Sequence, residues 1–481
     1  MQFLNGQQPS YDLTFRDVFI TPNLSKLESR FDISIEPVDD LGTTIPIVVA
    51  NMNAVAGKRM SETVARRGGL TVLPQDMSLE LVAKIVSYIK ERHPVYETPV
   101  LLHPSNTIMD AMNIMFKRAH GLAVIVNDKN EPVGIFSDED GAGYDRFTEL
   151  AYVMTQNPVT VTYGMAPAKI FNVLQKSHVA FAPVVKNGKI AGLVSQKGLL
   201  RSEIYKPAVN NKGELLTAVA VGINGNPKEK AERLLEMGVD VLVIDTAHGY
   251  QEKMIKAIKA VRSLSSDVPI VSGNVVTAEA TRDLIKAGAN IVKVGVGPGA
   301  MCTTRIMTAV GRPQFSAVLE CATAARELGA NVWADGGVRY PRDVVLALAA
   351  GASSVMIGTM LASTYESVGD TQIDEAGRLY KESFGMASRR AVKARIKSIP
   401  LFEQMKKEFF DEGISTSKLY INEERPGAED VLDYIVAGLR SAIAYSGATD
   451  LGSFYEKAVV GIQSPAGFDE GKAVDSSWEK T

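Results

Sequence analysis

The sequence predicts an α/β fold, a (β/α)8 TIM barrel that is interrupted by one insertion. Short β-branched runs alternate with amphipathic helical stretches along most of the 481 residues, which is typical of a parallel sheet covered by helices. Eight such runs are present, the number that closes a TIM barrel. The interval 95–205 breaks this alternation and carries an internal repeat instead.

The positions of the eight predicted strands define the barrel and the expected location of its site. Helical patterns such as 226–238 and 277–289 lie between them, and each ends next to a glycine, as helices commonly do. Residues 1–94 therefore form the first part of the barrel and 206–481 the remainder, with a flap and a C-terminal segment. Catalytic residues of TIM barrels lie on the loops after the strands. The predicted strands are 45–50, 69–73, 217–222, 239–245, 269–273, 290–296, 331–337 and 353–359.

The insertion consists of two similar halves, 95–152 and 153–205. EPVGIFSDED at 131–140 recurs 58 residues later as KIAGLVSQKG. Each copy has a helix, an apolar strand and then a glycine, two apolar residues and a serine, which resembles a tandem pair of CBS modules. The alternative is an accidental α/β repeat.

Composition excludes several classes of function. The chain has 52 Lys and Arg against 55 Asp and Glu, a net charge of -3, so neither a nucleic acid nor an acidic membrane surface is expected as a partner. It has no long apolar run and no signal-like start, which favours a cytoplasmic protein. Two cysteines and five scattered histidines predict a reducing compartment and no structural zinc site.

Cys302 is the candidate nucleophile. A free cysteine is most often a small buried apolar residue, and we expect this of Cys321, which lies in a helical run. Cys302 instead follows the glycine-rich loop GVGPGAM at the end of a predicted strand. Glycines let a ligand approach the backbone closely, and Thr303 and Thr304 add hydroxyls next to the thiol.

Two further strand ends predict a sugar-phosphate site. WADGGVR at 333–339 and MIGTM at 356–360 follow the seventh and eighth strands, where this fold commonly binds phosphate. Asp335 is suited to ribose hydroxyls, although the glycines could serve tight turns alone. Asp245, after the fourth strand, could hold a second ribose or cap a helix.

Four separated motifs resemble one family over essentially the whole chain, insertion included: the IMP dehydrogenase/GMP reductase family. They are IPIVVANMNAV (45–55), GVGPGAMCTTR (295–305), DGGVR (335–339) and GMAS (385–388). The resemblance implies that a cysteine attacks C2 of a purine nucleotide, and that hydride passes between C2 and a nicotinamide.

The resemblance also implies roles for individual residues. Cys302 would be the nucleophile, and Thr304 with Glu412 would protonate a departing amine. The substrate would contact Asn51, Met52, Asp335, Gly336, Gly337, Gly358, Thr359, Gly385 and Met386. The cofactor would face Asp245, Thr246, Ala247, Gly295, Val296 and Gly297. Carbonyls of Gly297, Gly299 and Cys302 match a potassium site of the dehydrogenases. Ala300 replaces a small hydroxyl residue, which removes one phosphate hydrogen bond worth about 1 kcal/mol.

The flap favours a reductase over a dehydrogenase. Dehydrogenases activate water with an Arg-Tyr pair on this segment, whereas 389–411 contains no tyrosine. PQFSAVLECA at 313–322 also looks like the reductase version of its helix. The sequence therefore predicts an NADPH-dependent GMP reductase of purine salvage that works through a Cys302 thioimidate. The inserted pair and the long flap are more usual in dehydrogenases, so oxidation of IMP to XMP with NAD is the alternative. A third possibility is a purine nucleotide sensor without turnover.

The insertion is expected to regulate the barrel through one nucleotide site. CBS modules that bind adenine nucleotides carry Ser or Thr followed three residues later by Asp, and Ser137 and Asp140 match this pattern. The second copy keeps Ser195 but has Gly198 in place of the acid. We expect ATP or GTP at the first copy only, with a purely structural insertion as the alternative. The resemblance further implies a homotetramer or octamer, and it leaves NADPH against NADH open.

Overall fold

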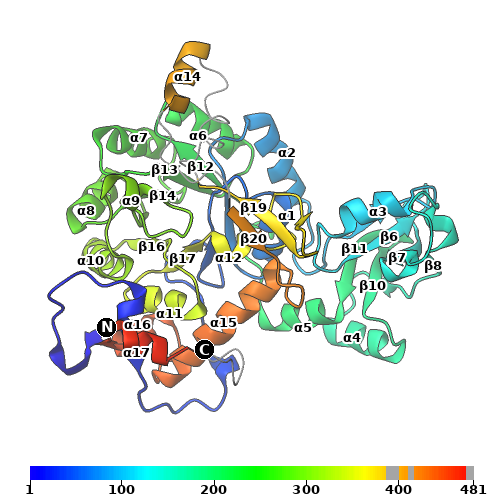
Figure 1. Cartoon of the computed structure of the whole chain (residues 1–481), viewed down its shortest axis with the longest axis horizontal. Coiled ribbons are helices and arrows are strands. Elements are labelled where there is room, and N and C mark those ends of the chain that lie inside the picture. Colours follow the sequence, from blue (N-terminus) through cyan, green and yellow to red (C-terminus); the bar gives the residue numbers. More distant parts are fainter. Residues whose placement is uncertain (386–399, 410–416, 473–481) are drawn as a thin grey trace.

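Eight parallel strands close into a barrel in the computed structural model, which describes residues 1–385, 400–409 and 417–472 (Figure 1). Each strand falls on one of the predicted runs, so the barrel prediction is confirmed. The strands are β3 (Ile47–Val49), β4 (Leu70–Leu73), β12 (Ala218–Gly222), β13 (Val241–Asp245), β14 (Ile270–Val275), β15 (Ile291–Val294), β16 (Asn331–Asp335) and β17 (Ser354–Ile357).

Helices surround the barrel, as the alternating pattern predicts. The predicted helix at 277–289 is α8, which begins where the Thr277 side chain accepts the Ala280 N–H and ends at Gly288 with φ +120°. The last helix of this ring, α15, packs against both α11 and α1 and so closes the ring. The helices are α1 (Lys58–Arg66), α2 (Leu79–Lys90), α6 (Pro227–Glu236), α7 (Glu252–Arg262), α8 (Ala278–Ala287), α10 (Gln314–Arg326), α11 (Pro341–Ala349) and α15 (Ala428–Tyr445).

Asp39 closes the barrel at the N-terminal ends of its strands. Trp333, which is fully buried, donates from Nε1 to Asp39 Oδ2 over 3.1 Å. The Ser353 hydroxyl donates to the same oxygen over 2.8 Å. Burial raises the pKa of Asp39, although these hydrogen bonds act in the opposite direction. The C-terminal ends of the strands are consequently where a ligand can enter.

The insertion lies beside the barrel and contains two sheets (Figure 1). Each sheet is built mainly from one half of the repeat, but the segment at 155–156 pairs with the first sheet and Glu97 pairs with the second, and below each is counted with the half that it pairs with. The assignment of the halves as CBS modules stays a prediction. The first half has β5 (Val100–Leu102), α3 (Ile108–Met115), β6 (Leu122–Val126) and β7 (Pro132–Ser137), and β8 (Thr155–Gln156) adds to its sheet. The second has β9 (Val161–Thr162), α4 (Pro167–Lys176), β10 (Phe181–Lys186), β11 (Lys189–Ser195) and α5 (Gln196–Ile204).

Buried ion pairs hold the insertion to the barrel. Glu62 on α1 pairs with Arg66 over 2.9 Å and with Arg118 of the first half, and the Glu62 side chain is 0% exposed. On the second half, Arg201 of α5 donates to Glu429, Asp430 and Asp433 on α15.

Two small sheets and several short helices complete the described chain. Strand β19 leads directly to Gly385 at the barrel mouth. In the described part of the chain, no helix combines the length and apolar character that crossing a bilayer needs. The sheets are β1 (Gln2–Phe3), β21 (Val459–Ile462) and β2 (Val18–Thr21), and β18 (Gln372–Ile373), β19 (Leu379–Ser383) and β20 (Ser417–Tyr420). The short helices are α9 (Thr304–Thr308), α12 (Thr359–Ala362), α14 (Leu401–Phe409), α16 (Leu451–Lys457) and α17 (Pro465–Glu470).

Candidate active site

A cavity of about 590 Å³ opens at the C-terminal ends of the barrel strands. Its wall is built by the loops that follow β3, β13, β15, β16 and β17. The structure thus brings together all the barrel-site residues predicted within the described ranges, while their individual roles stay predictions. These residues are Asn51, Met52, Asp245, Thr246, Ala247, Gly295, Val296, Gly297, Gly299, Cys302, Thr304, Asp335, Gly336, Gly337, Gly358, Thr359 and Gly385.

Cys302 is exposed on the loop between β15 and α9 and faces this cavity. Its backbone N–H donates to Gly299 O over 3.0 Å, which closes a tight turn. Its thiol donates to the Thr304 hydroxyl, with 3.2 Å between Sγ and Oγ1. Of the two hydroxyls expected near the thiol, that of Thr304 therefore lies within hydrogen-bonding distance of it. An exposed thiol beside a hydroxyl, over a cavity, is suited to nucleophilic attack on a bound ligand.

The two cysteines lie in opposite environments. Cys321 on α10 is fully buried. Burial raises the pKa of its thiol to about 12, with a hydrogen bond to Thr281 acting in the opposite direction. A buried thiol of this pKa is neutral and unreactive, in keeping with the packing role expected for Cys321.

A buried lysine that the sequence reasoning missed bridges the two predicted ribose carboxylates. Lys293 Nζ lies 2.8 Å from Asp245 Oδ1 and 2.7 Å from Asp335 Oδ2. Burial by itself would lower the pKa of Lys293, but the two carboxylates outweigh it and raise this pKa above its usual range. Lys293 is therefore a permanent cation that holds the Asp245 and Asp335 side chains at the cavity wall.

Amide side chains complete this network. Asn51 donates to Asp245 Oδ2 over 3.0 Å, and Asn274 donates to Asp335 Oδ2 over 2.9 Å. Both hydrogen bonds of the Asp335 side chain within the described residues fall on Oδ2, which leaves Oδ1 for a ligand. Asn274 Oδ1 is buried without a partner in the same part of the chain. It offers a second acceptor to a ligand.

The helix-capping alternative for Asp245 is wrong. The next helix, α7, begins at Glu252 with Gln251 as its N-cap, six residues beyond the aspartate. The Asp245 carboxylate is instead held by Lys293 and Asn51 at the cavity wall. It is thereby placed where it can accept hydrogen bonds from a ligand.

The predicted phosphate region requires glycine for steric reasons. Gly336 has φ +90°, a conformation that residues with a side chain rarely adopt. A Cβ there would also lie 3.1 Å from Gly299 N, so the Asp335 loop and the Cys302 loop pack closely. Gly358 and Thr359 line the same cavity from the end of β17. These backbones surround a space that a phosphate can approach without obstruction from side chains.

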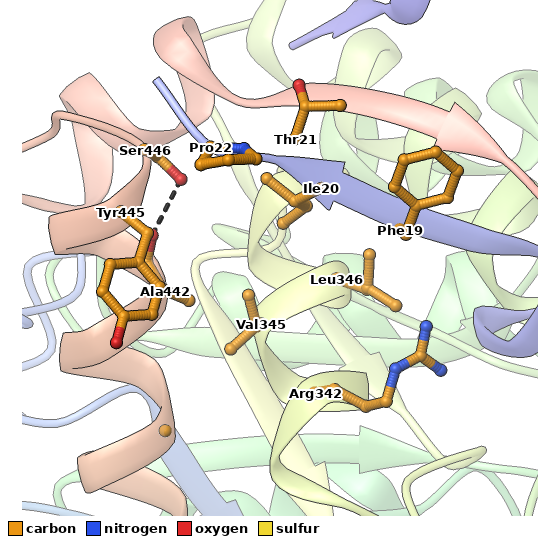
Figure 2. A pocket seen from close by; sticks show the side chains of 11 residues that line it. Phe19, Ile20, Thr21, Pro22, Arg342, Val345, Leu346, Ala442, Tyr445 and Ser446 are labelled. Atoms are coloured by element: carbon orange, nitrogen blue, oxygen red, sulfur yellow. Dashed lines mark hydrogen bonds between the residues drawn. The ribbon is translucent and has the colours of Figure 1, made fainter. Parts of the chain in front are cut away.

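A second cavity, of about 390 Å³, lies between β2, α11 and α15 (Figure 2). Its lining is mainly apolar, with Phe19 and Leu346 among the side chains drawn. The Ser446 hydroxyl is turned to the Ala442 carbonyl, to which it donates over 2.8 Å (Figure 2). Arg342 donates to the carbonyls of Phe15 and Val18. Among the residues lining this cavity there is no thiol, carboxylate or imidazole.

Some predicted residues lie elsewhere. Met386, Glu412 and most of the flap at 389–411 fall outside the described residues. Ser137 and Asp140 lie in the insertion and not at the barrel cavity. Their carboxylate-to-hydroxyl contact is nonetheless formed, since the Ser137 hydroxyl donates to Asp140 Oδ2 over 2.8 Å.

Comparison with known proteins identifies the family. The model of the IMP dehydrogenase / GMP reductase domain matches residues 12–473. The chain belongs to this family. GMP reductases of Mycobacterium tuberculosis and Mycobacterium bovis are 53% identical to it over 479 residues, which are 99% of this chain and 100% of theirs.

More distant relatives include both activities of the family. An inosine-5'-monophosphate dehydrogenase of Staphylococcus aureus is 37% identical over 467 residues, covering 95% of this chain and 94% of its own. A crystal structure of a GMP reductase from Trypanosoma brucei in complex with guanosine 5'-monophosphate is similar with a TM-score of 0.69. It is 29% identical, and the match covers 98% of this chain and 99% of that one.

Proposed function

We propose that this protein is a GMP reductase. The observation that carries the proposal is its 53% identity, over the full length, to mycobacterial proteins of that name. The exposed Cys302 over the barrel cavity supplies the nucleophile that such a reaction needs. The overall reaction converts GMP, NADPH and two protons to IMP, NADP⁺ and ammonium, which makes the enzyme an oxidoreductase of purine salvage.

The covalent step involves Cys302 and C2 of the purine. The Cys302 thiol forms a bond to C2, and its proton passes through the Thr304 hydroxyl to the exocyclic amine, which leaves as ammonia and gives a thioimidate. Thr304, with its hydroxyl 3.2 Å from the Cys302 sulfur, is positioned to pass a proton near C2. Hydride then adds to C2, and the C–S bond breaks to release IMP and the thiolate.

The carboxylate network orients the nucleotide. Asp335 Oδ1 accepts the ribose hydroxyls, while Lys293 and Asn274 hold Oδ2. Backbone N–H groups near Gly337 and Gly358 hold the 5'-phosphate. Because these contacts fix both ends of the ribose phosphate, C2 is presented to the thiol in a restricted geometry, which is a large part of catalysis.

The cofactor is NADPH, which supplies the hydride when it is bound. The residues present fit a nicotinamide: Asp245 and Thr246 line the cavity next to the Cys302 loop, and the buried Asn274 Oδ1 has no partner in the described chain. This acceptor suits a carboxamide N–H. Gly295, Val296 and Gly297 form the adjoining wall of the cavity.

A potassium ion fits the Cys302 loop. Carbonyl oxygens are suitable ligands for a hard monovalent cation, and Gly297, Gly299 and Cys302 lie on the loop between β15 and α9. The Gly299 carbonyl accepts the Cys302 N–H over 3.0 Å, which leaves it one further lone pair. These residues would hold the ion and fix the loop that carries the nucleophile.

The insertion is a pair of CBS modules with one site for ATP or GTP. Asp140 is held toward Ser137 by two hydrogen bonds, from the Ser137 N–H over 2.7 Å and from its hydroxyl. Ribose hydroxyls can replace the serine as donors. A homotetramer or octamer, suggested by the family resemblance, completes the proposal.

Nicotinamide absorbance tests the proposal. Purified protein with GMP and NADPH should oxidise the cofactor and release equimolar ammonia, whereas IMP and NAD should give no reduction. Oxidation of IMP with NAD, without any GMP-dependent loss of NADPH, would instead identify an IMP dehydrogenase. This second candidate has support from the 37% identical relative of Staphylococcus aureus.

A further inference from the structure

Strand pairing identifies equivalent residues in the two halves of the insertion. In the first half, Ile135 of β7 pairs with Thr155 of β8. In the second half, Leu193 of β11 pairs with Glu97, and both backbone hydrogen bonds between them measure 2.9 Å. Ile135 and Leu193 occupy the same position of the repeat, so Thr155 and Glu97 are structural equivalents.

Two glycines confirm this equivalence independently. A Cβ on Gly134 of the first half would collide with the side chain of Met154. A Cβ on Gly192 of the second half would collide with that of Tyr96. Met154 precedes Thr155 and Tyr96 precedes Glu97, which sets the same register from a second contact.

The acidic residue occupies a different position in each half. In the first half the acid is Asp140 on the turn after β7, and the Thr155 hydroxyl on the neighbouring strand reaches its Oδ1 at 3.4 Å. In the second half the turn has Gly198, and the acid is Glu97 on the strand. The serine of each half makes the same contact with its acid: Ser195 donates to Glu97 Oε1 over 2.6 Å.

Glu97 occupies the space that an aspartate at position 198 would need. A Cβ built on Gly198 would overlap Glu97 Oε1, so a side chain at 198 and the present position of Glu97 exclude each other. Gly198 and Ser195 are buried, whereas Thr155 of the first half is exposed. The residues that contact Glu97 are therefore enclosed, whereas the strand residue that contacts Asp140 is exposed; both acids are half-buried.

The enclosed turn connects directly to the barrel. It begins α5, since the Ser195 hydroxyl accepts the Gly198 N–H over 2.8 Å. Arg201 on α5 then binds the acidic residues of α15, and Figure 1 places α5 next to that helix. On the other side, Thr98 donates to Glu62 of α1 over 2.5 Å.

We infer that Glu97 occupies the position where a nucleotide would bind in the second half and makes the serine contact itself. The second half therefore binds no nucleotide and serves as a rigid connection between the insertion and the barrel. The first half alone keeps its acid available to a ligand with ribose hydroxyls. Only the identity of that ligand rests on the proposed nucleotide site at Asp140. The closure of the second half follows from Ser195, Gly198 and Glu97 themselves.

A double-mutant cycle on the intact chain tests the closure without any nucleotide. Gly198→Asp forces a second carboxylate against Glu97 and should speed amide hydrogen exchange across α5 by at least about tenfold. Glu97→Thr should have a smaller effect. The double variant Glu97→Thr/Gly198→Asp recreates the residues of the first half and should return α5 exchange to within about threefold of the natural protein. If the increase in the α5 exchange rate of the double variant equals the product of the increases in the two single variants, the inference is overturned.

Binding of ATP, measured by equilibrium dialysis, tests the ligand side. The natural chain should bind one equivalent and the double variant two, while the reverse exchange, Thr155→Glu/Asp140→Gly, should bind none. Two equivalents on the natural chain would overturn the closure of the second half. The natural chain could bind no ATP while the double variant still regains the natural rate of amide hydrogen exchange in α5. In that case the proposed site at Asp140 is wrong and the closure of the second half by Glu97 is supported.

Discussion

The barrel mouth and the Glu62 cluster of the junction both contain buried ion pairs, but those of the mouth are partly exposed to a cavity. At the mouth, Lys293 lies between Asp245 and Asp335, whose side chains are 16% and 21% exposed. At the junction, Glu62 and Arg66 are 0% and 3% exposed. The same type of interaction therefore faces a cavity in one region and protein on all sides in the other.

The difference lies in how many lone pairs remain free. Both Glu62 oxygens are occupied, since Arg66 and Thr98 donate to Oε2 while Arg118 and Tyr88 donate to Oε1. Such a saturated carboxylate can only hold elements together. Asp335, with Oδ1 left over, can bind a ligand, which distinguishes a binding site from a structural joint.

The largest effect is expected at the thiol of the mouth. Cys302→Ala should lower turnover by at least about 10⁴-fold, because no neighbouring group can replace the nucleophile. GMP affinity should stay within about tenfold, since ribose and phosphate contacts remain. Steady-state kinetics and isothermal calorimetry measure the two quantities. Cys321→Ala, the matched control in α10, should keep the natural rate; natural turnover in Cys302→Ala would contradict covalent catalysis.

Removing the cation of the mouth should be the next largest effect. Lys293→Met leaves Asp245 and Asp335 as unpaired neighbouring carboxylates that must reorient or take up a proton. We expect kcat/KM for GMP to fall by about 10²-fold, because the ribose is misplaced. Lys286→Met, an exposed lysine of α8, is the control and should have no effect. A rate within twofold of natural for Lys293→Met would show that the network is not needed to orient the substrate.

At the junction, loss of a charge should affect stability and not chemistry. Glu62→Gln leaves Arg66 and Arg118 without their anion and should cost about 3 kcal/mol in the free energy of unfolding. Turnover of the folded fraction should stay within about twofold. Chemical denaturation and kinetics on the same sample compare the two. A large loss of turnover without a loss of stability would mean that the junction takes part in catalysis.

Lowering the pH should remove the contribution of Glu62 to the free energy of unfolding over a defined pH range. Burial would raise the pKa of Glu62, but Arg118 and Arg66 outweigh it and lower this pKa from 4.5 to about 2. The ionised form is therefore the stabilising one, fully effective above pH 4.5 and lost as the pH falls through about 2. The difference in the free energy of unfolding between the natural protein and Glu62→Gln should decrease as the pH falls across this range. A difference that stays constant would show that the charge of Glu62 is not what stabilises the junction.

The smallest effect is expected at the exposed edge of the junction. Lys117 pairs with Asp370, whose side chain is 87% exposed. Lys117→Ala should change the free energy of unfolding by about 0.5 kcal/mol or less, because water screens such a pair. A change as large as that of Glu62→Gln would show that burial does not determine the strength of these contacts.

The sequence predicted the barrel better than it predicted the network inside it. β-branched runs mark the strands because buried parallel strands need them, and the glycine-rich loops that identify Cys302 and Asp335 are local patterns. Lys293 was missed because a single lysine in the apolar run NIVKVGV has no local signature. Its partners, Asp245 and Asp335, come from two other strands. Glu97 was missed for the same reason, since only strand pairing brings it to Ser195.

Covalent attack of Cys302 on GMP is the central claim, and the mass of the intact protein tests it most directly. Protein incubated with GMP in the absence of NADPH, then quenched in acid, should gain the mass of GMP less ammonia. The gain should map to the peptide that contains Cys302, should be absent from Cys302→Ala, and should disappear when NADPH is added before quenching. An unmodified protein under these conditions, together with GMP-dependent oxidation of NADPH by Cys302→Ala, would contradict the account.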